Sequence, residues 1–264
     1  MRMNSPANPQ PARSAGKTRR EFLQAAAGVA MASSVSSCAH MDPAPPDALI
    51  IDTHQHLWDL SQIQPPWLDA ASATLRQSYT NADYAKAIAG LNVRSVYMEV
   101  DVAPRDHVRE ADMVVAQCRA ANTPMIAATI GGRPDAPDFQ QYVERYAKSG
   151  PVKGLRQVLH VASTPPGHCL RDDFVRGVRL LGKHRLNFEL TMRPTELLDG
   201  AKLTERCPDT SFVVDHCGNG DPKAFNPRLA PEMKRSCTAD EWRRGMDALA
   251  KRPNVVCKIG RAHV

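Results

Sequence analysis

The sequence predicts an α/β fold in which helices cover a parallel sheet, and a (β/α)8 TIM barrel is the form that fits best. From Ala48 onward, short apolar runs alternate with longer amphipathic runs, which is the pattern of successive βα units. Polar residues stand where several apolar runs end, and in a barrel those ends form one mouth. No Gly-x-Gly-x-x-Gly follows the first run, which disfavours an open nucleotide-binding sheet.

Seven apolar runs have the length of strands, and six runs between them repeat apolar residues every three or four positions, as helices do. The expected strands are 49–52, 95–102, 125–130, 154–159, 187–191, 211–214 and 254–258. The expected helices are 82–89, 107–121, 139–148, 172–183, 195–206 and 240–251.

The charge of the chain is concentrated at its amino end. The 264 residues include 34 basic and 28 acidic residues, a formal net charge of +6. Residues 1–38 carry five basic residues and one acidic residue, so the remainder has 29 basic and 27 acidic residues, a net charge of +2. A nearly neutral body lacks the basic surface that nucleic acids require, so we expect a small-molecule substrate and no nucleic-acid partner.

Residues 1–40 are expected to be an export signal outside the fold. Arg19-Arg20-Glu21-Phe22-Leu23 precedes a short, weakly apolar, alanine-rich segment, and this order resembles a twin-arginine signal. The segment is too short for a committed membrane span. Val35-Ser36-Ser37-Cys38 resembles a lipoprotein box. The exported protein is therefore expected either free in the periplasm or attached to the envelope membrane through acylated Cys38.

Six further cysteines are scattered along the body of the chain, at positions 118, 169, 207, 217, 237 and 257. No Cys-x-x-Cys pair is present, which argues against a zinc ribbon or a Cys-x-x-Cys redox motif. Export permits disulfides, but the spacing does not determine which thiols approach closely enough to pair.

His54 and His56 are the first candidates for chemistry. Residues two apart on a strand point to the same face, so two imidazoles converge at the end of the first predicted strand. Such a pair suits a metal ion or a polarised carbonyl group. Other polar residues at strand ends are Glu99, Asp101, Arg156, His160, Arg193, Asp215 and His216.

Four segments in order together resemble the amidohydrolase superfamily, and more narrowly its lactonase branch of fuconolactonase-like, rhamnonolactonase-like and pyrone-dicarboxylate lactonase-like proteins. They are Ile51-Asp52-Thr53-His54-Gln55-His56-Leu57-Trp58, Val152-Lys153-Gly154-Leu155-Arg156, Phe212-Val213-Val214-Asp215-His216-Cys217-Gly218 and Asn254-Val255-Val256-Cys257-Lys258. The resemblance implies a (β/α)8 barrel, here the domain 41–258, that hydrolyses a lactone, in preference one of a sugar acid.

The resemblance also implies roles for individual residues. His54, His56 and His216 match metal ligands, His216 and Asp215 match catalytic positions, and Arg156 and Glu99 match positions that bind substrate. Arg193 and Trp58 are further candidates for substrate binding, with packing as the alternative for Trp58. Neither a lysine suited to a carbamylated two-metal bridge nor a fifth-strand histidine is found. We therefore expect one divalent ion, zinc in preference, or none, since the branch that this chain resembles has members with one divalent ion and members without any.

The family pattern includes an eighth strand that ends in a Gly-Ser-Asp-Trp-type segment, whose aspartate is the expected general base. About seven strands are found here, so the barrel is expected to be incomplete. Residues 259–264 depart from the family pattern and resemble a translated sequencing adapter, an expected artefactual tail. Because barrel closure requires every strand, we expect the 264-residue chain by itself to aggregate or to be inactive.

Two other functions remain open from the sequence. Decarboxylases on the same scaffold also use a first-strand histidine pair. A surface-anchored binding lipoprotein without catalysis is the second alternative. The sequence leaves the substrate, the oligomeric state and the disulfide pattern open.

Overall fold

The computed structural model describes residues 48–121, 123–226, 228–229 and 233–259. The chain divides into the units Met1–Pro46 and Asp47–Val264, and every described residue belongs to the second. The expected export signal, with Cys38, and residues 260–264 of the expected tail lie outside the described residues.

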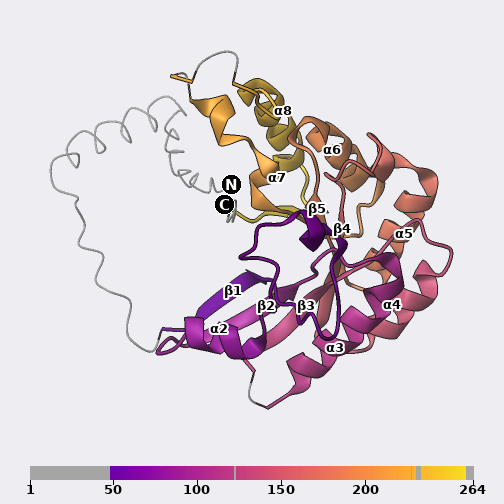
Figure 1. The fold of residues 1–264 in the computed structure, drawn as a ribbon. Coiled ribbons are helices and arrows are strands. Elements are labelled where there is room, and N and C mark those ends of the chain that lie inside the picture. The colour runs from indigo at the N-terminus through magenta and orange to yellow at the C-terminus, as the bar shows by residue number, and fades with distance from the viewer. Residues whose placement is uncertain (1–47, 122, 227, 230–232, 260–264) are drawn as a thin grey trace, which may run out of the picture. The chain divides into compact units, whose positions relative to one another are not determined.

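Seven parallel strands form one sheet in which each strand pairs with the next along the chain, in the order β1 to β7. The sheet curls, as Figure 1 shows, into part of a barrel. The strands are β1 (Ile50–Gln55), β2 (Val93–Met98), β3 (Met125–Gly131), β4 (Val152–Val158), β5 (Asn187–Thr191), β6 (Phe212–Val214) and β7 (Val255–Cys257).

Helices connect the strands and follow one another around the outside of the curled sheet (Figure 1). The α-helices are α2 (Asn81–Ala87), α3 (His107–Arg119), α4 (Phe139–Ala147), α5 (Asp172–Lys183), α6 (Leu197–Arg206), α7 (His216–Asn219) and α8 (Ala239–Ala250). Short 3-10 helices are η1 (Pro66–Ala70), η2 (Pro104–Asp106), η3 (His168–Leu170), η4 (Pro194–Glu196) and η5 (Pro222–Phe225). Among the described residues, no helix has the length and apolarity needed to cross a bilayer.

The predicted alternation of strands and helices is confirmed, with ends that move by a few residues. The predicted helix 195–206 divides into η4 and α6, because Pro194 begins a tight turn at the end of β5. The signals that begin two helices are capping boxes. Thr80 with Asp83 caps α2, and Thr238 with Glu241 caps α8, which satisfies amide groups that the first helical turn leaves unpaired.

The hydrophobic core lies between the sheet and the outer helices. Its largest fully buried side chains include Tyr97, Phe174, Phe188 and Phe212. Phe188 contacts Phe174 and Phe212 edge to face, with ring centroids 5.7 and 6.3 Å apart, a favourable arrangement for aromatic rings. This packing joins neighbouring strands to α5 and makes the sheet a rigid support for the residues at its carboxyl ends.

The two end strands of the sheet, β1 and β7, each pair with only one strand within the described part of the chain. Apolar side chains on them are open to solvent, with 46% of Ile51 and 63% of Val256 exposed. Edges of this kind are where a sheet accepts further strands.

Candidate active site

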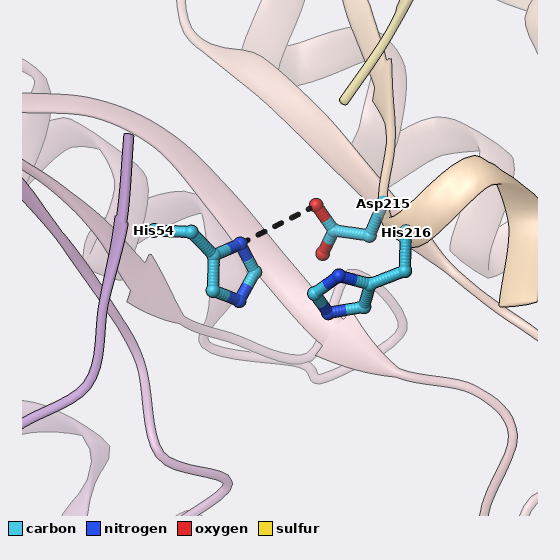
Figure 2. Close-up of side chains that lie close together, drawn as sticks. All are labelled: His54, Asp215 and His216. Atoms are coloured by element: carbon cyan, nitrogen blue, oxygen red, sulfur yellow. Dashed lines mark ion pairs between the residues drawn. The ribbon is translucent and has the colours of Figure 1, made fainter. Parts of the chain in front are cut away.

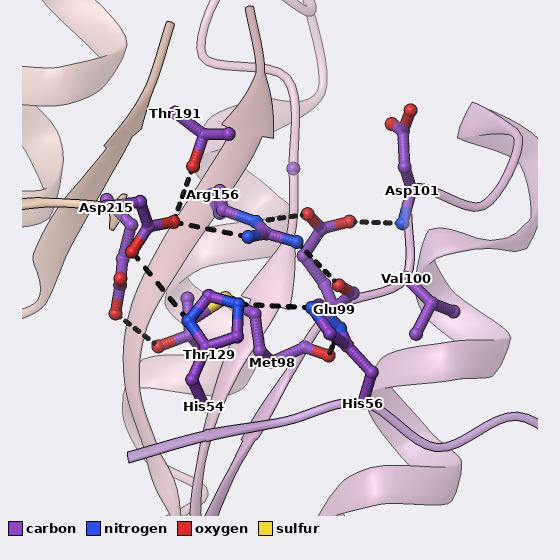
Figure 3. A network of polar contacts seen from close by, with 12 residues as sticks. His54, His56, Met98, Glu99, Val100, Asp101, Thr129, Arg156, Thr191 and Asp215 are labelled. Atoms are coloured by element: carbon purple, nitrogen blue, oxygen red, sulfur yellow. Dashed lines mark hydrogen bonds and ion pairs between the residues drawn. The ribbon is translucent and has the colours of Figure 1, made fainter. Parts of the chain in front are cut away.

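The carboxyl ends of the parallel strands bring together most of the predicted site residues. His54 is in β1, Glu99 directly follows β2, Arg156 is in β4 and Asp215 directly follows β6. Figure 3 shows these side chains pointing toward one another across the inside of the curled sheet. The predicted convergence at one mouth is therefore found for these four residues.

His54 and His56 approach each other closely, with 3.1 Å between their Nε2 atoms. The Nδ1 of His56 lies 3.0 Å from the carbonyl oxygen of Met98, which can only accept a hydrogen bond, so Nδ1 carries the proton. In the neutral ring Nε2 is then bare, and it accepts a hydrogen bond from Nε2–H of His54. The Met98 carbonyl thus fixes the tautomer of His56 and leaves Nε2 as the atom that can ligate a metal.

Both imidazoles are held in the neutral form. Burial and the neighbouring His56 lower the pKa of His54 to about 2. The protein around the ring and the Arg156 guanidinium lower the pKa of His56 to about 4, although part of this residue is exposed. Neutral imidazole is the form that binds metal ions.

Arg156 is buried and joins two carboxylates. Its Nε donates to Glu99 Oε1 at 2.5 Å, and its terminal nitrogens donate to the Glu99 carbonyl at 2.8 Å and to Asp215 Oδ2 at 3.2 Å. Burial alone would lower the pKa of Arg156, but Glu99 and Asp215 raise it above its usual value. All three nitrogens of the guanidinium are engaged by the protein, so Arg156 fixes the relative positions of Glu99 and Asp215.

Asp215 is fully buried and is surrounded by donors. Thr191 Oγ1 donates to its Oδ2 at 2.5 Å, and Lys258 Nζ lies 2.9 Å from its Oδ1. Burial alone would raise the pKa of Asp215, but a hydrogen bond shared with Glu189 and the charges of Arg156 and Lys258 hold it below the usual range. Asp215 is therefore an ionised carboxylate.

Lys258 is the site residue that the sequence did not predict. It directly follows β7, and its ammonium group contacts Glu189 Oε2 as well as Asp215. No strand-end lysine suited to a carbamylated bridge is expected from the sequence, and in the structure Lys258 is a cation that lies between two carboxylates. Burial and Asp215 in turn raise the pKa of Glu189 to about 7.

His216 stands in an unusual turn at the end of β6. His216, Cys217, Gly218 and Asn219 all have positive φ angles, between 50° and 65°. Three of these residues are not glycine, and each costs about 1 kcal/mol or more in this conformation. A Cβ on Gly218 would lie 2.9 Å from Leu197 side-chain atoms. The strained turn places the His216 ring against His54, with ring centroids 4.6 Å apart.

His54, Asp215 and His216 form a candidate metal centre, which Figure 2 shows from close by. One ligand atom from each lies within 4.8 Å of the others, and no other group of three is found in the part of the chain that the structure describes. His56 can add a fourth ligand once the proton between the two rings has left, because its Nε2 lies 3.1 Å from His54 Nε2, close to the separation of about 3.3 Å between two nitrogens on one tetrahedral zinc ion. Neutral imidazoles and a carboxylate also form a donor set that suits zinc, so these residues fit the ion.

Two predicted residues do not join this cluster. The guanidinium of Arg193 donates to Glu196 and to the carbonyl groups of Val161 and Thr164, each at 2.6 Å. Trp58 is buried, donates to the Gln77 carbonyl at 2.7 Å and packs edge to face against neighbouring aromatic rings. Their proposed contacts with substrate remain predictions.

A family model described as Amidohydrolase matches residues 51–262. The chain belongs to the amidohydrolase family. It is similar to an L-fucono-1,5-lactonase of Burkholderia multivorans, with 28% identity over 215 residues that cover 80% of this chain and 68% of that protein.

Solved amidohydrolase structures agree with this assignment. The Amidohydrolase 2 from Bifidobacterium longum subsp. infantis is 30% identical with a TM-score of 0.58, and the match covers 80% of this chain and 72% of that chain. An amidohydrolase from Burkholderia multivorans, solved with bound zinc, is 25% identical with a TM-score of 0.61, and that match covers 80% and 69%.

Behind the candidate active site of this amidohydrolase, a further buried carboxyl group supports the end of β2. Glu110, on α3, is fully buried, and its Oε1 accepts hydrogen bonds from the Val100 amide at 2.9 Å and from the Tyr97 hydroxyl at 3.0 Å. Burial and the neighbouring Glu99 raise the pKa of Glu110 to about 8. Glu110 therefore keeps its proton in the folded state at neutral pH.

The substitution Glu110→Gln is expected to change how stability depends on pH. Between about pH 4.5 and pH 8 Glu110 retains in the folded chain a proton that it releases in the unfolded chain, so this residue contributes a loss of stability as the pH rises. The glutamine variant lacks this loss. Between about pH 6.5 and pH 8 the difference between the two chains should reach about 2 kcal/mol, because the histidines titrate alike in both and their contribution cancels. Urea unfolding across this range measures it.

Exposed Glu144 on α4 supplies the matched control. The substitution Glu144→Gln is expected to leave the pH dependence of the unfolding free energy as in the wild type. If the unfolding free energies of the wild type and Glu110→Gln depended on pH in the same way, the buried carboxyl would not hold its proton.

Proposed function

We propose that the chain is a lactone hydrolase that acts on a sugar-acid lactone with one zinc ion. The observation that carries the proposal is the pair of neutral, converging imidazoles of His54 and His56 at the mouth, with His216 and ionised Asp215 beside them. Similarity to the L-fucono-1,5-lactonase supports the substrate class, and similarity to the zinc-containing amidohydrolase supports the metal.

His54, His56 and His216 would hold the zinc ion. When bound, zinc polarises a carbonyl group and lowers the pKa of a bound water. Asp215 stays ionised, and its Oδ1, which lies 3.9 Å from His54 Nδ1, would offer the ion a further ligand. Arg156 is a positioning residue, because each nitrogen of its guanidinium donates to Glu99 or Asp215 and so fixes where these two residues lie. The rigid sheet ends hold these groups before substrate arrives, which is what efficient ester hydrolysis requires.

A substrate panel tests this proposal. Sugar-acid lactones are incubated with the zinc-loaded protein, both as the 264-residue chain and in a form extended by an eighth strand. Ring opening is followed by the proton that each hydrolysed lactone releases. In parallel, carboxylated aromatic acids are tested for CO2 release. Lactone opening that requires His54 and His56 supports the proposal. CO2 release without lactone opening would assign the chain to decarboxylation, and ligand binding without either reaction would indicate a binding protein.

Lys258 is expected to compete with a divalent ion for Asp215. Its ammonium group lies 2.9 Å from Asp215 Oδ1, and like charges about 4 Å apart repel by several kcal/mol near a protein surface. The substitution Lys258→Met should therefore raise zinc affinity about tenfold or more, as measured by competition with a chromophoric chelator. Lys251→Met, at the end of α8 and away from Asp215, serves as the control and should leave the affinity unchanged. Unchanged affinity in Lys258→Met would contradict the competition.

We propose also that residues 1–40 direct export by the twin-arginine route. The arginine pair and the alanine-rich segment support this proposal, as does the lipoprotein box at Cys38. Cell fractionation tests it. The chain should reach the cell envelope, and the double substitution of Arg19 and Arg20 by Lys should retain it in the cytoplasm. Equal distribution of both forms would contradict export.

A further inference from the structure

Two cysteines that are forty positions apart meet beside the active site. Cys257 is the last residue of β7 and pairs in register with Val214 of β6. The backbone continues this contact, because Lys258 N donates to the Val214 carbonyl at 2.9 Å and Cys217 N donates to the Lys258 carbonyl at 2.9 Å. Cys217 and Cys257 are therefore held side by side by main-chain hydrogen bonds.

The two thiols lie against the same stretch of main chain, Lys258 and Ile259, directly after β7. Cys217 Sγ lies 3.8 Å from the Ile259 carbonyl, and Cys257 Sγ lies 3.5 Å from the Lys258 carbonyl. Burial, together with the charge and hydrogen bonding of the Cys217 thiol, raises the pKa of Cys257 to about 11. Cys257 is nevertheless exposed and Cys217 half-buried, so small reagents can reach the pair.

The pair also joins two parts of the proposed active site. Cys217 lies in the strained turn that follows Asp215 and carries His216, and Cys257 immediately precedes Lys258. The Cys217 carbonyl accepts a hydrogen bond from Trp242 Nε1 at 2.7 Å, which fixes the turn against α8. A covalent bond here would fasten the turn to β7.

We propose that Cys217 and Cys257 form a redox pair that a low-molecular-weight disulfide converts into an intramolecular disulfide. One thiolate attacks the reagent disulfide, forming a mixed disulfide and releasing one reagent thiolate, which takes up the proton. The second cysteine attacks the mixed disulfide at the protein sulfur and releases a second reagent thiol. Two protein thiols are oxidised by two electrons, and one reagent disulfide is reduced to two thiols. The export signal expected at residues 1–40 would deliver the pair to an oxidising compartment.

The disulfide closes a loop of about 40 residues, which restricts the unfolded chain. Oxidation should therefore raise the thermal midpoint by about 5 °C or more. The effect should be reversed by a dithiol reductant. Because the proposal depends on backbone contacts and thiol positions, it stands whether or not the chain hydrolyses lactones.

The test equilibrates the full chain in glutathione buffers of increasing oxidation, blocks free thiols with an alkylating reagent and maps the peptides by mass spectrometry. The expected result is one cross-linked peptide pair, Cys217 with Cys257, while Cys169, Cys207 and Cys237, which are buried, stay reduced. Cys217→Ser and Cys257→Ser should each abolish the cross-link and the thermal shift, and Cys118→Ser should change neither.

Three outcomes would overturn the proposal. The first is alkylation of both thiols at every glutathione ratio. The second is a dimer joined through Cys257 on a non-reducing gel in place of the internal cross-link. The third is a thermal shift on oxidation that persists in Cys257→Ser.

Discussion

Replacing Arg156 by methionine is expected to lower the free energy of unfolding by about 3–5 kcal/mol. The side chain is buried, and its guanidinium is the group that holds Glu99 and Asp215 together. Methionine fills a similar volume but leaves two buried carboxylates without this cation. An uncompensated buried charge costs far more than the net value of an ion pair, so the loss should exceed that of an ordinary core substitution. Urea unfolding monitored by circular dichroism measures it.

The surface pair of Arg145 and Asp112 provides the control. Its nitrogen and oxygen lie 2.6 Å apart, but about half of each side chain is exposed. Arg145→Met should therefore cost no more than about 1 kcal/mol. Adding Glu99→Gln to Arg156→Met should restore part of the lost stability, because one of the unpaired charges is removed. Equal losses in Arg156→Met and Arg145→Met would contradict the large penalty expected when two buried carboxylates lose their cation.

The fold could be predicted because its signals are local. Strand β5 and helix α5 begin and end at the predicted residues, since an apolar run and an amphipathic repeat are each visible within a dozen positions. The split of the predicted helix 195–206 into η4 and α6 was missed because Pro194 allows a tight turn and a helix start equally. The register between neighbouring strands, by contrast, cannot be predicted from any single segment of the sequence.

The site residues that could be predicted are those whose positions depend on a single strand. The residues that were missed depend on how neighbouring strands pair. His54 and His56 converge because of the period of a single strand end. Lys258 was missed because its partner Glu189 is in β5 and its partner Asp215 directly follows β6. Only the pairing of β5 with β6 and of β6 with β7 brings the three residues together. Glu110 was missed because it lies on a helix among apolar positions, where a carboxyl normally faces solvent. Arg193 stands at a strand end as predicted, but the following turn directs it to Glu196.

The substitution His54→Ala is expected to remove most of the zinc affinity and the proposed activity. His54 is the one residue that contacts all the other candidate ligands: His56 Nε2 at 3.1 Å, Asp215 Oδ1 at 3.9 Å and the ring of His216. Loss of a supporting contact to a ligand already costs about 10–100-fold in metal affinity, so loss of the ligand itself should cost at least about 100-fold. Lactone turnover should fall at least about 1000-fold, about 4 kcal/mol of barrier.

Measuring zinc affinity, turnover and thermal midpoint on the same preparations separates a lost ligand from a lost fold. His54 is half-buried and does not belong to the hydrophobic core. The thermal midpoint of His54→Ala should therefore stay close to that of the wild type. His184→Ala, at the carboxyl end of α5 and away from the mouth, is the matched histidine control and should change none of the three quantities. A His54→Ala chain that keeps both wild-type zinc affinity and wild-type turnover would mean that the converging imidazoles are not the metal centre. Full zinc affinity with lost turnover would instead indicate that His54 orients the substrate carbonyl and does not hold the ion.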